Sequence, residues 1–235
     1  MPDPSRFADR SVAMQYQGPD AADLMNVFVL NDAFIVWQRT RPADESRERG
    51  LAPETRARLG DLGCEQRERL ARTPFLLMSL AEDDEARWQS LFTERRTRDL
   101  LQCLQIRDEV ASGLIAAGLG FLWQLARRNP YATRLVSGAS LKWCEQLSAC
   151  TLMDLFARAL EDQTLLAPRM ADNTDLWHRL LTAGVSNRRH VRLAARVSAM
   201  QSMLIERPGR AYRPLAAAAC RMPPVKTRKS GSRGT

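Results

Sequence analysis

The stretch Trp88-Gln89-Ser90-Leu91-Phe92 returns in altered form as Trp177-His178-Arg179-Leu180-Leu181. In each copy a Trp stands three and four residues ahead of two large apolar residues, which places the three side chains on one face of an α-helix. Each copy also follows an acidic turn, Glu82-Asp83 in the first and Asp172-Asn173 in the second. A helical segment that occurs twice indicates an internal repeat, and a repeat determines how the whole chain is interpreted.

The correspondence continues toward the N-terminus. Val36-Trp37-Gln38 matches Leu122-Trp123-Gln124, and Leu59 matches Leu147. Three further pairs keep the same order: Arg49-Gly50-Leu51 with Ser137-Gly138-Ala139, Leu70-Ala71-Arg72 with Phe156-Ala157-Arg158, and Phe75-Leu76-Leu77 with Thr164-Leu165-Leu166. We interpret the matches as two tandem copies of one helical unit of about 85 residues. Because identity is low, chance similarity between helical patterns is the alternative.

The repeat divides the chain into four parts and predicts an all-α fold. Residues 1–23 are rich in Pro, Asp and Gly and are expected to form a flexible arm. The first helical repeat is expected at 24–105, and the second at 106–207, ending in a basic helix. Residues 208–235 are expected to be a disordered basic tail.

Helix signals place elements within the first repeat. Asp23 is expected to cap a helix over 24–39, and Pro53 to begin a second one. A short helix is expected at 65–72 and a long one from about 84 to 109. We also expect Trp37 with Trp123, and Trp88 with Trp177, to occupy equivalent places as core anchors.

Charge is distributed unevenly along the 235 residues, whose formal net charge is +8. Residues 186–235 contain twelve Lys and Arg but only one acid, Glu206, whereas residues 1–185 are slightly acidic. This asymmetry favours nucleic acid or another anionic surface as the partner. A solvated tail in an Arg-rich protein is the alternative.

The candidate DNA-binding residues lie in the basic helix expected from about 186 to 206 and in the tail. Basic residues near a helix N-terminus oppose the helix dipole, so their clustering there indicates a role other than helix stability. A solvated helix face explains the cluster equally well. The candidates are Arg188, Arg189, His190, Arg192, Arg196, Lys226, Arg228 and Lys229.

Other classes of function find little support in the sequence. Five cysteines and two histidines lack metal-ligand spacing, and neither a phosphate-binding G-x-x-x-x-G-K-[ST] loop nor a G-x-S-x-G motif occurs. We therefore expect no enzyme activity, no cofactor and no metal. The N-terminus lacks the apolar core of a signal peptide, and the apolar stretch 114–122 is shorter than a membrane span. A cytoplasmic protein is expected.

The order of elements in the repeat resembles the flagellar transcriptional activator subunit FlhD and its relatives. The best stretch is 119–204, in which Leu147-Ser148-Ala149-Cys150-Thr151-Leu152 is similar to the family's Leu-x-x-Leu-Thr-Leu segment, and Val197–Leu204 to its closing helix. The resemblance implies a DNA-associated regulator that acts with a zinc-bearing FlhC-like partner. It also implies a dimer of all-helical units, here fused as an intramolecular pseudo-dimer.

This chain departs from the family pattern in two ways. The family subunit is a single unit, and the cysteine that it uses across its dimer interface falls near Met78 and Ala167 here. No such disulfide is therefore expected. A helical protein-interaction adaptor without direct nucleic-acid contact is the alternative function, and the oligomeric state is left open.

Overall fold

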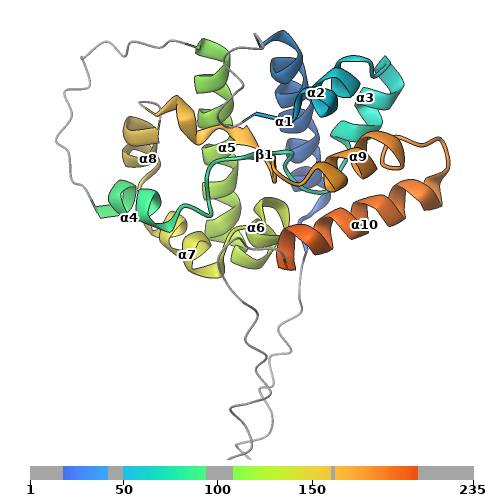
Figure 1. The fold of residues 1–235 in the computed structure, drawn as a ribbon. Helices are drawn as coiled ribbons and strands as arrows, with labels where there is room; N and C mark the ends of the chain where they lie inside the picture. Colours follow the sequence, from blue (N-terminus) through green and yellow to red (C-terminus); the bar gives the residue numbers. More distant parts are fainter. Residues whose placement is uncertain (1–17, 42–49, 94–107, 160–161, 206–235) are drawn as a thin grey trace, which may run out of the picture.

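The computed structural model describes residues 18–41, 50–93, 108–159 and 162–205. Within these ranges the chain is all-α, as the sequence predicts, with ten α-helices, one 3-10 turn and two strands of two residues. Figure 1 shows α1 and α5 upright at the centre, with the shorter helices around them. The elements are α1 (Ala21–Thr40), α2 (Pro53–Gly60), α3 (Cys64–Ala71), β1 (Met78–Ser79), α4 (Glu85–Thr93), α5 (Glu109–Arg128), α6 (Pro130–Ser137), α7 (Leu141–Ala149), α8 (Leu152–Ala159), η3 (Gln163–Leu165), β2 (Ala167–Pro168), α9 (Thr174–Thr182) and α10 (Arg189–Ile205).

The first helix begins slightly earlier than expected. Asp20, not Asp23, is its N-cap: the Asp20 carboxylate accepts a hydrogen bond from the Asp23 N–H at 2.7 Å, and the Asp23 carboxylate accepts one from the Asp20 N–H at 3.0 Å. This capping box satisfies two N–H groups that lie before the first complete turn. Residues 21–23, expected to belong to the arm, are therefore helical.

The two long helices pack against each other in opposite directions. Near the end of α1, the Trp37 indole N–H donates to the Asp108 carboxylate, which caps α5, at 2.8 Å. At the end of α5, Arg128 donates to the carboxylates of Asp20 and Asp23 at 3.0 and 2.5 Å. The end of each helix therefore lies at the beginning of the other.

The same contacts affect the Asp108 carboxyl. Burial raises its pKa, but hydrogen bonds from the Ala111 N–H and the Trp37 indole, with the Arg41 charge nearby, hold the pKa below its usual value. The carboxylate is therefore stabilised in the charged form that suits a helix N-terminus.

The bounds of α1 and α5 place the halves in register at an offset of 88 residues, from Ala21 to Glu109. Seven of the eight buried positions of α1 (23, 27, 30, 31, 34, 37 and 38) meet buried positions of α5 at this offset. The expected equivalence of Trp37 with Trp123 is wrong, because the helix bounds align Trp37 with the buried Leu125. Trp123 lies two residues earlier, about 200° around the helix, and is only half-buried.

The other elements repeat at nearly the same offset. From α2 to α7 and from α3 to α8 it is 88 residues, and from β1 to β2 and from α4 to α9 it is 89. Leu59 and Leu147 are both buried, as expected from their correspondence. The place of α6 corresponds to residues 42–49, which lie outside the described residues.

The strands join the two halves. They pair antiparallel, with Met78 opposite Pro168 and Ser79 opposite Ala167. Each strand is followed by a residue of positive φ, Ala81 at 54° and Met170 at 48°. The chain then enters a helix whose Trp is 1% exposed and donates its indole N–H to the carbonyl eight residues before it, Trp88 to Leu80 and Trp177 to Arg169. The expected equivalence of Trp88 and Trp177 is confirmed.

After each strand the chain crosses to the opposite half: α4, which follows β1, packs on the second half, and α9, which follows β2, packs on the first. Figure 1 shows α4 beside α7 and α8, and α9 beside α2. The Trp88 ring meets Trp143 of α7 edge-on, with centroids 5.1 Å apart, and Lys142 of α7 pairs with Glu85 of α4. On the other side Arg58 of α2 contacts His178 of α9 at 2.5 Å. The halves are therefore interlocked.

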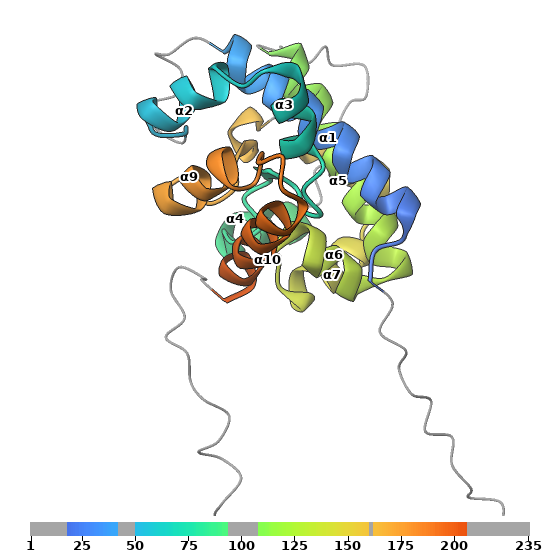
Figure 2. The same ribbon diagram turned by 90° about the vertical axis from the view of Figure 1, so that its right-hand side faces the viewer.

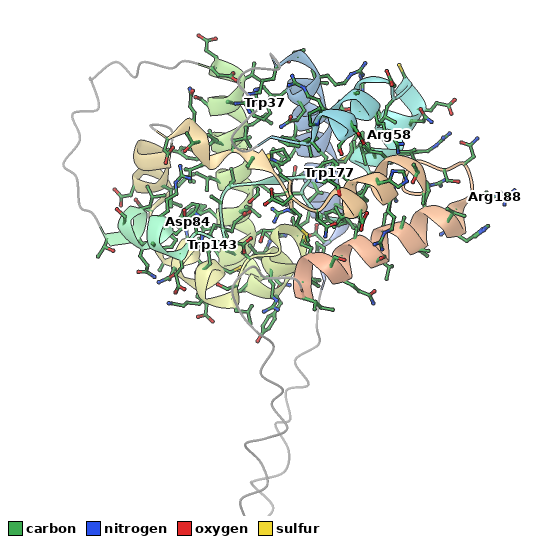
Figure 3. All side chains as sticks on the ribbon, in the orientation of Figure 1. Trp37, Arg58, Asp84, Trp143, Trp177 and Arg188 are labelled. Atoms are coloured by element: carbon green, nitrogen blue, oxygen red, sulfur yellow. The ribbon has the colours of Figure 1, made fainter. Side chains whose placement is uncertain are left out.

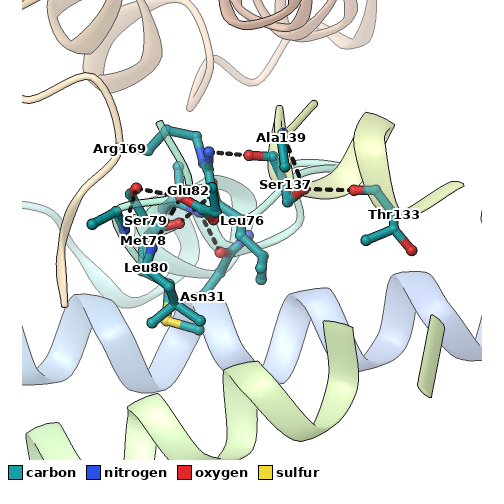
Figure 4. A network of polar contacts seen from close by, with 12 residues as sticks. Asn31, Leu76, Met78, Ser79, Leu80, Glu82, Thr133, Ser137, Ala139 and Arg169 are labelled. Carbon is teal, nitrogen blue, oxygen red and sulfur yellow. Dashed lines mark hydrogen bonds and ion pairs between the residues drawn. The ribbon is translucent and has the colours of Figure 1, made fainter. Parts of the chain in front are cut away.

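A buried ion pair lies at this crossing (Figure 4). The Arg169 guanidinium donates to the carbonyls of Leu76 and Met78 at 2.7 Å and to the Glu82 carboxylate at 3.0 Å. Glu82 also accepts from the Leu80 N–H at 3.1 Å. Because both side chains are buried and their polar atoms are bonded, removing one partner would leave an uncompensated charge, at a cost of about 3–5 kcal/mol.

Asn31 gives the first half a polar tether. Its side chain, fully buried on α1, donates to the carbonyls of Ala71 and Phe75 at 3.1 and 2.9 Å and accepts from the Leu77 N–H at 2.7 Å. These bonds fix the segment between α3 and β1. Because that segment is not helical, its backbone N–H and C=O groups need partners from elsewhere in the chain. At the equivalent place on α5 stands Leu119, also fully buried.

The closing helix α10 packs against α9 and the end of α6. Its buried face is Ala195, Ala199 and Met203. Gly138, which ends α6 with φ 71°, lies beneath it, and a Cβ there would come 2.7 Å from the Met203 Cγ. Glycine suits this turn for two reasons: it tolerates the left-handed backbone, and it has no Cβ to collide with α10.

Of the other helices predicted from the sequence, two are confirmed and one is shorter than expected. The helices expected from Pro53 and over 65–72 are confirmed as α2 and α3. The long helix expected over 84–109 does not reach its predicted end, because Asp108 has an extended backbone that separates it from α5. Residues 94–107 lie outside the described residues, as do 1–17 of the arm and 206–235, which include the tail.

α5 is apolar enough to be compared with a membrane span. By length and composition alone it qualifies, with a mean hydropathy of 1.3 over its most apolar window, and it is the one helix within the described ranges that does. Half of that window is buried inside the protein, where α5 packs against α1, α6, α7 and α8. Such burial is what the core helix of a folded domain shows.

Candidate nucleic-acid interface

A basic tip precedes and begins α10. We define it as Arg188, Arg189 and His190, all exposed. Figure 3 shows Arg188 at the edge of the molecule, pointing away from the body. Residues 176–205 contain five arginines and two histidines but no acid. The tip therefore carries a local positive charge that no neighbouring carboxylate in the sequence neutralises.

Arg192 and Arg196 point toward the protein rather than outward. Arg192 donates to the carbonyls of Ser186 and Asn187 at 2.7 and 2.9 Å. Arg196 donates to the carbonyl of Arg69, near the end of α3, at 2.6 Å. Helix ends leave carbonyls unpaired, so Arg196 acts as a C-terminal cap for α3. These two predicted site residues thus have structural contacts that the sequence pattern did not indicate.

The pKa of Arg196 is lowered, chiefly by burial and further by the charges of Arg192 and Arg72. Arg72, Arg192 and Arg196 therefore lie near one another where α3 and α10 meet. Arg72 is paired with Glu68 at 2.8 Å on its own helix, whereas Arg192 donates to the backbone carbonyls of the 186–187 turn.

Sequence reasoning missed the basic residue types that other helices contribute to the same side. Figure 2 shows α2, α3, α9 and α10 together on one side of the molecule. Arg58 and His178 join α2 to α9, and Arg179 of α9 donates to the Ser198 hydroxyl of α10 at 2.9 Å. No local motif marks these residues, because they come from both halves and meet only in the folded chain.

The turn before α10 is held from two directions. The Ser186 N–H donates to the Ala183 carbonyl at 3.2 Å, and the Arg188 N–H to the Ser186 hydroxyl at 3.2 Å. From α3, the Arg69 guanidinium donates to the Val185 carbonyl at 3.3 Å and to the Asn187 side-chain oxygen at 2.5 Å. The tip is therefore presented by a fixed turn.

A second surface feature lies away from the tip. A shallow hollow between the beginning of α1 and the end of α5 is lined by Asn26, Trp123, Gln124, Arg127 and Arg128, among others. Arg127 stacks over the Trp123 ring at 4.8 Å, and Arg128 is bonded to α1. Its cations are thus already engaged with neighbouring side chains.

Two further predictions concern chemistry. Across the described ranges, no three His, Cys, Asp or Glu side chains gather as a metal site would require. The positions that the FlhD resemblance assigns to an interface cysteine, Met78 and Ala167, lie in the strand pair that joins the halves. Lys226, Arg228 and Lys229 lie outside the described residues.

Comparisons of this chain with models of known protein families, with curated proteins and with solved structures give no match.

Proposed function

We propose that this protein is a DNA-associated transcriptional regulator of FlhD type, built from two helical units that form an intramolecular pseudo-dimer. The observation that carries the proposal is the acid-free basic tip, exposed at the end of a helix and held by a fixed turn. In this proposal the protein is cytoplasmic and has no enzyme activity.

The repeated element bounds support the pseudo-dimer. At the offset of 89, Met78 corresponds to Ala167 and Ser79 to Pro168. The observed pairs are Met78 with Pro168 and Ser79 with Ala167. A two-fold axis exchanges equivalent positions in this manner, so that if one residue contacts a second, their equivalents make the reverse contact. The antiparallel α1 and α5 and the exchanged α4 and α9 agree with the same axis.

The tip would act by contacting DNA phosphates. Guanidinium groups bind phosphate oxygens through charge-assisted, frequently bidentate hydrogen bonds. Such contacts set position and supply affinity but read no sequence. Sequence specificity would then come from a partner subunit, which the FlhD resemblance suggests is an FlhC-like, zinc-bearing protein.

A gel-shift titration with a mixed-sequence duplex tests the proposal. The Arg188→Gln/Arg189→Gln variant should bind more weakly, and the slope of log K against log salt should flatten by about 0.9 for each lost phosphate contact. The control Arg39→Gln/Arg127→Gln removes the same number of exposed charges from α1 and α5 and should keep the slope. Equal slopes for wild type and the tip variant would overturn the assignment.

An adaptor function is the second candidate, and one observation favours it. The outer face of α10 exposes Leu193, Val197 and Ile205 by 60, 48 and 76%. Apolar residues that recur on one exposed helix face are typical of helix-in-groove contacts between proteins. If the wild-type chain fails to retard any duplex at about 0.1 M salt, while Leu193→Ser/Val197→Ser abolishes co-purification of a partner, the adaptor function is favoured.

A further inference from the structure

Arg69 links the two halves at the turn that carries the basic tip. It lies on α3 of the first half, with a side chain 25% exposed. One guanidinium nitrogen donates to both the Val185 carbonyl and the Asn187 side chain of the second half, and the other to Glu65 at 2.6 Å. The side chain thus reaches across the junction and is braced on its own helix.

The linkage runs in both directions. Arg196 of α10 donates back to the carbonyl of Arg69, so α3 and α10 are joined at the turn and again two helical turns further on. Two contacts separated along a helix fix its rotation as well as its position. The direction in which Arg188 and Arg189 point is therefore set by α3.

We propose that Arg69 and Asn187 form a latch by which the first half positions the phosphate-binding tip of the second, so that Arg69 is a positioning residue and not a phosphate contact. The inference rests on the proposed DNA function. A tip that is already fixed loses less conformational freedom when it binds, which strengthens binding without adding a contact.

Asn187→Ala is the decisive variant, because it removes the shorter of the two hydrogen bonds that Arg69 donates to the turn, leaves the 3.3 Å bond to the Val185 carbonyl, and keeps every charge in place. If Arg69 positions the tip, duplex affinity should fall about three- to tenfold while the salt slope stays at the wild-type value. Arg69→Gln should give the same loss and the same slope. If Arg69 instead touches a phosphate, Arg69→Gln should flatten the slope by about 0.9 and Asn187→Ala should bind normally, which would overturn the proposal.

Hydrogen exchange provides a readout that does not involve DNA. In both latch variants, amide exchange in residues 183–190 should become faster, while the α1 and α5 amides stay protected. The control Ser198→Ala removes a side-chain hydrogen bond from Arg179 elsewhere on α10 and should change neither exchange in the turn nor affinity. Unchanged exchange in both latch variants would refute the latch. If the latch variants exchange faster but the wild type binds no duplex, the proposed DNA function fails and the latch stands as a structural link only.

Discussion

The two halves have the same order of elements and differ in what their equivalent positions hold. At the centre of α1 stands Asn31, whose side chain is hydrogen-bonded to Ala71, Thr73, Phe75 and Leu77, whereas α5 has Leu119 in its place. At the crossing, Arg169 of the second half corresponds to Leu80 of the first. Asn31 and Leu119 are both buried, and so are Leu80 and Arg169. Equivalent positions therefore share their burial even where one side chain is polar and the other is apolar.

The apolar core positions are shared between the halves, whereas several polar positions are not. Where apolar packing determines the structure, as at Leu59 and Leu147, the halves agree. Two buried polar features have no counterpart in the other half: Asn31 fixes the segment before β1 within the first half, and the pair of Glu82 with Arg169 joins the two halves. The basic tip also occurs once among the described residues. In the proposed pseudo-dimer, joining both units in one chain allows each to specialise while their pairing is intramolecular.

The largest effect is expected at the equivalent tryptophans. Trp88→Ala and Trp177→Ala should each lower the free energy of unfolding by about 3–5 kcal/mol, because each removes a fully buried ring. Trp123→Ala, at a half-buried ring, should cost clearly less. Urea unfolding at constant m-value measures all three. Similar costs for Trp123 and Trp177 would contradict the register assigned from the helix bounds.

A smaller effect is expected from exchanging the central residues of the two long helices. Asn31→Leu copies the second half but removes the Asn31 partner of the Leu77 N–H and of the Ala71 carbonyl, while the Phe75 carbonyl keeps the Thr73 hydroxyl. The expected cost is about 1–3 kcal/mol for each buried group that finds no partner. Leu119→Asn should also destabilise, because it buries an amide among apolar side chains. Thermal unfolding of both variants tests the asymmetry. A neutral Asn31→Leu would mean that the tether contributes no stability.

Sequence reasoning reached the all-α class and the equivalence of Trp88 with Trp177 because spaced apolar residues report burial directly. It failed for Trp37 and Trp123, because matching the two Trp-Gln pairs gives an offset of 86 residues. The bounds of α1 and α5 give an offset of 88. The exposed tip was found from charge alone. Arg69 and Asn187 could not be found, because their contact joins residues 118 apart in sequence through a turn.

An engineered disulfide can test whether β1 and β2 pair within one chain. Ser79 and Ala167 stand opposite each other and are both partly exposed, and directly opposed strand residues lie within the Cα separation that a disulfide spans. After mild oxidation of Ser79→Cys/Ala167→Cys, peptide mapping should find the link between residues 79 and 167 within a single chain. Absence of that link, or its formation only between chains, would contradict the intramolecular pairing.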